Sequence, residues 1–163
     1  MVICGAKIVK KLRKSIDLHS KSLGTHIMAQ FTTHYLGTLR CENIHNQSNT
    51  IIHTDAPTDN QGQGLAFSPT DLCALSLTTC IITTMGIYAN MKNIEIVSIA
   101  AETNKIMASE PRRIAKIEAT IRIKVGDSAT DRDKEGLQRI IKSCPVSKSL
   151  HPDIEQNIEL FWD

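Results

Sequence analysis

An uncharged run of twenty residues, Leu72 to Met91, constrains the fold of this chain more than any other feature. A helix of that length is long enough to cross a lipid bilayer. The run also contains five serine and threonine side chains, which make it only moderately apolar: Ser76, Thr78, Thr79, Thr83 and Thr84. A helix with no charged face is otherwise typical of a protein core. We therefore expect a long helix that is buried on all sides within a domain or a dimer core, and no membrane span.

The residues before this run mark where the helix begins. Ser68 is a suitable N-cap and Pro69 suits the first helical position. Asp71 stands three residues after Ser68, where it can complete a capping box. The preceding segment, residues 55–64, is rich in Asp, Pro, Asn, Gln and Gly and has no apolar period, which predicts a loop. The helix is therefore predicted from this capping motif to about Met91.

Extended segments precede and follow the helix. Strand patterns are found over residues 30–45 with a bend at Gly37, and over residues 50–54, 94–107, 117–125 and 158–162. Thr130 and Asp133 form a second capping-box pattern, which predicts a further helix before the last strand. Because strands and helices do not alternate as in a Rossmann fold, this order predicts an α+β domain with antiparallel sheet packed on helices.

The length and composition argue against several classes of protein. A domain of 163 residues can bury roughly 70% of the surface of its unfolded chain, so it needs no disulfide or structural metal. Only 4% of the residues are aromatic, which argues against a base-stacking surface for nucleic acid. The five cysteines match no disulfide scaffold, and the first residues have no signal-peptide pattern. We expect a protein of a reducing compartment, the cytoplasm.

The N-terminal segment differs in charge from the rest of the chain. Residues 1–27 carry six basic side chains and one acidic side chain, whereas the remainder is net acidic. The spacing of Ile8, Leu12 and Ile16 is typical of a solvated helix with one buried stripe. A membrane-surface helix, an anion-binding helix and a targeting peptide are the alternatives. We predict a basic, helical extension over residues 1–27 and a domain over residues 28–163.

Cys80 lies in the middle of the uncharged run, and two interpretations of it are open. It is either a nucleophilic thiolate in a dry pocket or a small apolar filler, since free cysteine is among the most buried residue types. Cys73 lies two turns earlier on nearly the same face, about 10.5 Å away along the helix axis. These two cysteines therefore cannot form a disulfide within one straight helix.

Cys144 directly precedes Pro145, and it also has two interpretations. Proline at the first helical position would make Cys144 an N-cap, with its sulfur near free backbone N–H groups that favour the thiolate. Alternatively, Cys144 continues the apolar stripe of Leu137, Ile140 and Ile141 as a core residue.

Two charged residues are candidate partners of a thiolate. Arg40 could stabilise it by charge-assisted hydrogen bonds, although strand arginines are commonly just solvated. Asp71 could orient Arg40, although capping its own helix already accounts for it. The cysteine and histidine spacings fit no CxxC or HExxH pattern, so we expect no metal site.

Two separated motifs occur together in this chain. Ser68-Pro69-Thr70-Asp71-Leu72 lies ahead of Cys80, and Ser143-Cys144-Pro145-Val146-Ser147-Lys148-Ser149-Leu150 lies near the C-terminus. Over roughly residues 30–162, the chain resembles the OsmC/Ohr family of organic hydroperoxide reductases, and within it the OsmC-like branch. The resemblance implies an intertwined α+β homodimer with the OsmC-like fold, in which antiparallel sheets surround two buried central helices and the active sites lie at the subunit interface.

The resemblance also implies roles for individual residues. Cys80 stands at the place of the peroxidatic cysteine and Cys144 at that of the resolving cysteine. Arg40 stands at the place of the arginine that hydrogen-bonds the thiolate, and Asp71 near that of the acid that orients this arginine. In the Ohr branch the acid directly follows the proline, where this chain has Thr70, so Asp71 is one residue out of register.

We therefore predict a thiol-dependent peroxidase of oxidative stress defence that reduces organic hydroperoxides, with hydrogen peroxide as a second candidate substrate. The expected partners are a second copy of the chain, the peroxide and an external dithiol reductant. No metal, flavin or haem is expected. The alternatives are a ligand-binding module or a redox sensor on the same fold.

Overall fold

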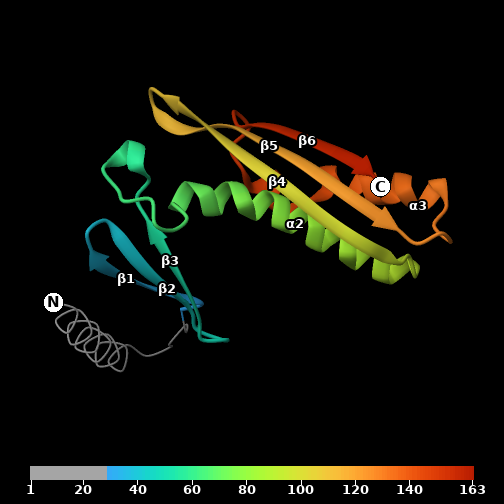
Figure 1. Ribbon diagram of the computed structural model, residues 1–163, viewed down its shortest axis with the longest axis horizontal. Helices are drawn as coiled ribbons and strands as arrows, with labels where there is room; N and C mark the ends of the chain where they lie inside the picture. The colour runs from blue at the N-terminus through green and yellow to red at the C-terminus, as the bar shows by residue number, and fades with distance from the viewer. Residues whose placement is uncertain (1–28) are drawn as a thin grey trace. The chain divides into compact units, whose positions relative to one another are not determined.

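The computed structural model describes residues 29–163, and the expectations for residues 1–27 lie outside this range (Figure 1). The chain divides into two compact units, the first ending at Pro69 and the second running from Thr70 to Asp163. The predicted division at residue 28 stays a prediction.

The first unit contains a three-stranded antiparallel sheet in the order β1-β2-β3. Its strands are β1 (Phe31–Gly37), β2 (Arg40–His45) and β3 (Thr50–Asp55). The bend predicted at Gly37 is a full reversal that makes two strands out of the one expected, since Gly37, Thr38 and Leu39 all have positive φ. Residues 46–49, between two of the predicted strand segments, form the turn across which β2 pairs with β3.

The loop predicted after β3 is confirmed and is closely folded around the carbonyl groups of Ala56 and Pro57. It contains a short 3₁₀ helix, η1 (Thr58–Asn60). The Gly64 N–H donates to the Ala56 carbonyl at 3.2 Å, and the Gly62 N–H donates to the Pro57 carbonyl at 3.0 Å. A Cβ atom on Gly62 would overlap the Ala56 carbonyl, so the loop requires glycine there.

The second unit contains the long helix, three strands and two shorter helices. They are α2 (Pro69–Lys92), β4 (Ile96–Ser109), β5 (Arg112–Val125), α3 (Asp131–Ser143), α4 (Pro145–Ser149) and β6 (Glu155–Trp162). The predicted start of α2 is confirmed. The predicted capping box of α3 is also confirmed, because the Thr130 side chain accepts from the Asp133 N–H and the Asp133 carboxylate accepts from the Thr130 N–H.

The sheet of the second unit has the order β4-β5-β6 and is mixed. β4 and β5 are antiparallel, as predicted for the sheet, but β6 pairs with β5 in parallel. The expectation of purely antiparallel sheet was therefore wrong for the last strand. The chain crosses from β5 to β6 through α3 and α4, and a crossover of this kind returns the chain in the same direction.

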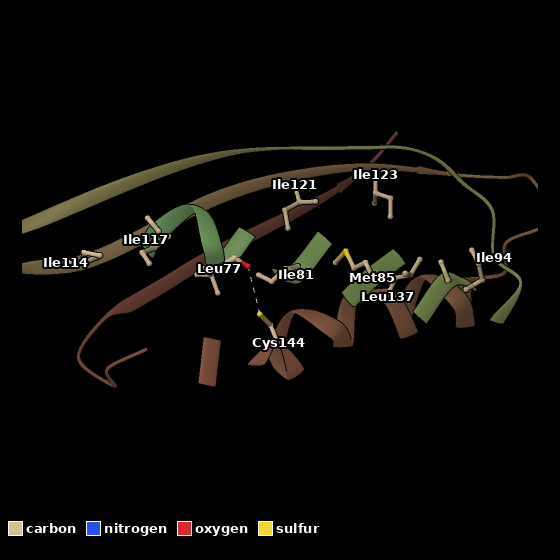
Figure 2. Close-up of a cluster of buried hydrophobic side chains, with 12 residues drawn as sticks. Leu77, Ile81, Met85, Ile94, Ile114, Ile117, Ile121, Ile123, Leu137 and Cys144 are labelled. Atoms are coloured by element: carbon tan, nitrogen blue, oxygen red, sulfur yellow. Dashed lines mark hydrogen bonds between the residues drawn. The ribbon is translucent and has the colours of Figure 1, made fainter. Parts of the chain in front are cut away.

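The core of this unit forms around one side of α2. Figure 2 shows Leu77, Ile81 and Met85 between the isoleucines of β5 on one side and Leu137 and Cys144 on the other. The three α2 side chains are completely buried. Burying one side chain of this size contributes about 1.5–3 kcal/mol to stability. The Thr78 hydroxyl is satisfied by the Thr103 hydroxyl of β4 at 2.7 Å.

Another side of α2 is not covered by the rest of its chain. Leu75, Ile87 and Met91 are 38%, 55% and 75% exposed, so the single chain does not bury the helix on all sides as expected. Among the described helices, α2 is long and apolar enough to cross a membrane, with a mean hydropathy of 1.7 over 18 residues. The core helix of a soluble protein meets the same criterion, so this is weak support for a membrane span.

Gly136 of α3 provides a test of the packing between α2 and α3. A Cβ atom at this position would overlap the hydroxyl group of Tyr88, which lies on α2. In a helix without such a contact, replacing glycine by alanine stabilises the protein by about 1 kcal/mol. A loss of stability in Gly136→Ala would therefore come from the overlap with Tyr88. We expect Gly136→Ala to lower the free energy of unfolding by about 1–3 kcal/mol in urea denaturation. The exposed neighbour variant Gln138→Ala is the control and should change it by less than about 0.5 kcal/mol. A Gly136→Ala protein as stable as the parent would contradict the proposed packing.

Candidate redox site

Two cysteines that are distant in the sequence lie together in the second unit. Cys80 is half-buried on α2, and Cys144 is fully buried between α3 and α4. Each thiol shifts the pKa of the other, and Cys80 packs against the buried cluster that contains Cys144. Within the described residues all four cysteines are free thiols. The site therefore contains a reduced cysteine pair positioned to interact directly.

Cys144 combines the two interpretations that its sequence left open. It is the residue before α4, with Pro145 at the first helical position, as the N-cap interpretation predicted. Its side chain makes no cap hydrogen bond and its pKa is raised, so the predicted preference for the thiolate is wrong. It is also completely buried in the core with Leu137, as the core interpretation predicted. Its thiol lies 4.0 Å from the carbonyl oxygen of Leu77, one turn before Cys80 on α2 (Figure 2).

The surroundings of Cys80 favour its thiolate. Burial by itself raises the pKa of Cys80, because it removes the charged form from water. Hydrogen bonds from the Cys144 thiol, the Val146 backbone N–H and the Thr84 hydroxyl act in the opposite direction and prevail, so the pKa of Cys80 lies below its ordinary value. The Val146 N–H is one of the free donors in the first turn of α4.

Cys144 has the opposite shift. Burial raises its pKa, and the hydrogen bond to Cys80 raises it further because the Cys144 proton is shared with the Cys80 sulfur. The backbone N–H groups of Ser147 and Val146 oppose this rise without cancelling it. At a pH between the two pKa values, Cys80 is the thiolate and Cys144 is the protonated thiol.

Thr84 and Val146 are site residues that the sequence analysis missed. The Thr84 oxygen lies 4.0 Å from the Cys80 sulfur, and its hydroxyl donates to the Cys80 carbonyl at 2.7 Å. The spacing of four residues on a helix could have identified Thr84, because it places both side chains on one face. No sequence signal relates Val146 to Cys80, since that contact depends on how α4 packs against α2.

Arg40 lies in the first unit, at the start of β2. Its guanidinium is 3.7 Å from the carboxylate of Asp55, which is its cross-strand partner on β3. Asp55 is 2% exposed, and the same carboxylate oxygen accepts the Leu65 N–H at 3.0 Å. Asp55 was not a candidate from sequence. The register of β2 and β3 places Asp55 opposite Arg40, so the pairing of the two predicted strands was the signal that could have identified Asp55.

Asp71 has a different cation as its neighbour. The Lys105 ammonium of β4 donates to the Asp71 carboxylate at 2.6 Å and to the Thr70 hydroxyl at 2.8 Å. This ion pair joins the first turn of α2 to β4. The predicted role of Asp71 toward Arg40 stays a prediction, and the Arg40 contact that is seen involves Asp55.

The remaining candidates for ligands lie apart from the thiol pair. Among the described residues, no group of three His, Cys, Asp or Glu side chains could hold a metal ion. A hollow of about 250 Å³ lies over the three strands of the second unit's sheet. It is lined by Glu102, Asn104, Glu118, Ala119, Thr120, Asn157 and Glu159, and by neither Cys80 nor Cys144.

The asymmetry of the two thiols can be tested by alkylation. In the reduced protein, the rate of Cys80 modification by iodoacetamide should rise with pH through an inflection below that of an ordinary cysteine thiol, because the pKa of Cys80 is lowered. Cys144→Ala removes one hydrogen-bond donor, so the inflection should move to higher pH. Peptide mapping by mass spectrometry assigns the modified residue, and Cys73→Ala is the control. An inflection unchanged in Cys144→Ala would contradict the hydrogen-bond argument.

Comparison with known proteins identifies the family. The model of OsmC-like proteins matches residues 62–159. A crystal structure from Psychrobacter arcticus, of a protein described as an osmotic stress induced and detoxification response protein, is 43% identical, with a TM-score of 0.74 over 85% of this chain and 99% of that one. No curated protein matches the sequence.

Two more distant structures share the fold. An OsmC-like protein from Mycoplasma pneumoniae is 17% identical, with a TM-score of 0.67 over 85% of this chain and 99% of that one. An organic hydroperoxide resistance protein from Legionella pneumophila is 14% identical, with a TM-score of 0.61 over 84% and 99%. The family model and the Psychrobacter relative together show that this chain belongs to the OsmC-like protein family.

Proposed function

We propose that this protein is a thiol-dependent peroxidase that reduces organic hydroperoxides in oxidative stress defence. The observation that carries the proposal is the pair of neighbouring thiols in the core of the second unit, with the pKa of Cys80 lowered and the pKa of Cys144 raised. A peroxide-reducing cysteine must react as thiolate, and a second thiol nearby is needed to trap its oxidised form. Both requirements are met by residues of the second unit.

In the first step the Cys80 thiolate attacks the terminal oxygen of the hydroperoxide. An S–O bond forms and the O–O bond breaks, so the sulfur is oxidised by two electrons to a sulfenic acid. The alkoxide leaves and takes up a proton as the alcohol. The proton that Cys144 shares with Cys80 is a nearby source for this transfer.

In the second step Cys144 attacks the sulfur of the sulfenic acid. The S–S bond forms and the S–O bond breaks, and the leaving hydroxide takes up a proton from solvent and departs as water, so that one peroxide has been converted to alcohol and water at the expense of two thiol groups. An external dithiol then reduces the disulfide by thiol–disulfide exchange and restores both cysteines. This cycle requires no metal, flavin or haem.

Membership of the OsmC-like family supports a role in redox chemistry or hydroperoxide resistance in general, and it does not identify a specific reaction. The Legionella protein is described as an organic hydroperoxide resistance protein, but at 14% identity it shares only the fold with this chain. The activity is therefore proposed from the geometry of Cys80 and Cys144 in this chain. A soluble protein of the cytoplasm, where dithiol reductants keep thiols reduced, suits the free state of these cysteines.

We assign the charged residues supporting roles. Arg40 is proposed to stabilise the Cys80 thiolate and to position the peroxide, as the family resemblance implies. Its ion pair with buried Asp55 supports this, because a fixed carboxylate restricts where the guanidinium can point. Asp71 is proposed to act less directly, by holding the first turn of α2 against Lys105 of β4.

A homodimer is part of the proposal. The uncovered apolar side chains of α2, Leu75, Ile87 and Met91, form a surface that water solvates poorly. A second copy of the same helix is the occupant that the family resemblance implies. Covering this surface would complete the burial that the uncharged sequence of α2 predicts.

The decisive experiment is peptide mapping by mass spectrometry after one equivalent of an organic hydroperoxide is added to the reduced protein. We expect a Cys80–Cys144 disulfide within seconds. Cys80→Ser should abolish peroxide consumption. Cys144→Ser should consume one peroxide per site and leave Cys80 open to overoxidation. Peroxide consumption by both variants at the rate of the parent would contradict the scheme.

The acid that serves Arg40 can be identified with two matched variants. Asp55→Asn keeps the shape and an acceptor for Leu65 but removes the charge facing Arg40, so we expect peroxide reduction to slow by roughly tenfold. Asp71→Asn removes a charge that faces Lys105, so its effect on the rate should be smaller. Stopped-flow peroxide consumption gives both rates. A larger loss of rate in Asp71→Asn than in Asp55→Asn would show that Asp71, and not Asp55, orients Arg40.

A non-catalytic module is the second candidate. The observation in its favour is that Thr70 and Asp71 both bind Lys105, where the peroxidase branch of the family has an acid for its arginine. Under this hypothesis Cys80 should react with organic hydroperoxide no faster than a free thiol at the same pH. A redox sensor would instead oxidise quickly but would not be restored by cellular dithiols.

A further inference from the structure

Gln156 is a polar residue in an apolar row. The inward positions of β6 are Ile158, Leu160 and Trp162, all packed against the core, and Gln156 occupies the first position of the same row. Its neighbour on β5 is Ile117, which is completely buried. Packing alone would favour an aliphatic side chain at this position, so the amide has another use.

Both ends of the Gln156 amide bind one residue of α4. The Ser147 hydroxyl donates to Gln156 Oε1 at 2.6 Å, and Gln156 Nε2 donates to the Ser147 carbonyl at 3.1 Å. These reciprocal bonds fix both the side chain and the backbone of Ser147. They hold it to a strand that is itself anchored in the sheet by its pairing with β5.

Ser147 lies in the turn that meets the two thiols. Ser147 follows Cys144 by three residues in the first turn of α4, where the Lys148 N–H donates to the Cys144 carbonyl at 3.2 Å. The Val146 N–H is one of the groups that lower the pKa of Cys80. α4 has only five residues, and a helix this short is not stable without contacts from outside. The packing of Val146 and Leu150 against the core and the bonds from Gln156 are the contacts that keep it in place.

We propose that Gln156 is a positioning residue of the redox pair, which clamps Ser147 and thereby holds Cys144 and the Val146 N–H against Cys80. Gln156 touches neither sulfur, so its effect is transmitted through α4. Two consequences are expected: Cys80 forms its thiolate at lower pH, and Cys80 and Cys144 condense to a disulfide faster. The second consequence rests on the proposed function, whereas the first does not.

Gln156→Leu tests the proposal, because it completes the apolar row and removes the clamp. We expect its stability in urea to equal or exceed that of the parent. We also expect the inflection of Cys80 alkylation to move to higher pH, and disulfide formation after peroxide addition to slow by about tenfold, as when two ordinary hydrogen bonds no longer fix a turn. The control is Asn157→Ala, the exposed neighbour on the same strand, which should behave as the parent.

Partial variants separate the two bonds of the clamp. Ser147→Ala removes the bond to Oε1 and keeps the bond to the carbonyl, and Gln156→Glu does the reverse. Each should give an intermediate alkylation profile, and both remain informative if Gln156→Leu does not fold. A double Gln156→Leu and Ser147→Ala variant should match Gln156→Leu alone, because the two residues act as one unit.

The outcomes distinguish this proposal from the peroxidase proposal. A Gln156→Leu protein with the alkylation profile of the parent would overturn the positioning role. A shifted profile in a protein whose parent form does not reduce peroxide would leave the positioning role standing and refute the peroxidase. The alkylation measurement uses the reduced protein without peroxide, so it is independent of the second result.

Discussion

The packing of α2 between the sheet and the α3–α4 segment is the constraint on which the second unit depends. Leu77, Ile81 and Met85 are completely buried, and they lie on the helix that also carries Cys80. The packing of α2 on α3 requires glycine at position 136, because Tyr88 of α2 occupies the space that a side chain there would fill. Because the site is built on this rigid packing, the position of Cys80 relative to α4 is fixed by the core and not by flexible loops.

The chemistry of the site results from an unequal sharing of donors between two sulfurs. Both thiols lose hydration on burial, and burial alone would raise the pKa of each. Cys80 receives hydrogen bonds from three groups, one of which is the Cys144 thiol itself, so stabilising one thiolate keeps the other thiol protonated. This division suits a nucleophile and its resolving partner. It requires the first turn of α4 to stay in place, which gives the amide of Gln156 its importance.

Patterns of local origin were predicted well from the sequence. The start of α2 at Pro69, the capping box at Thr130 and the strands β4 and β5 each depend on a few neighbouring residues. The direction of β6 was not predicted, because it depends on the path of the chain through two helices. The sequence also left open whether α2 is buried by its own chain or in a dimer core, since an uncharged helix has no sequence signal for the chain that covers it.

For the site, the sequence by itself determined which residue types are present and the family they resemble: a cysteine in an uncharged helix, a Cys-Pro motif, and a strand arginine. The Cys-Pro motif also determined the N-cap position of Cys144, because proline restricts the backbone that follows. Only the tertiary structure decided that Cys144 lies against Cys80, that Asp55 faces Arg40, and that Asp71 faces Lys105. These contacts join residues on different elements, and their energies depend on distance and burial, which no local pattern in the sequence encodes.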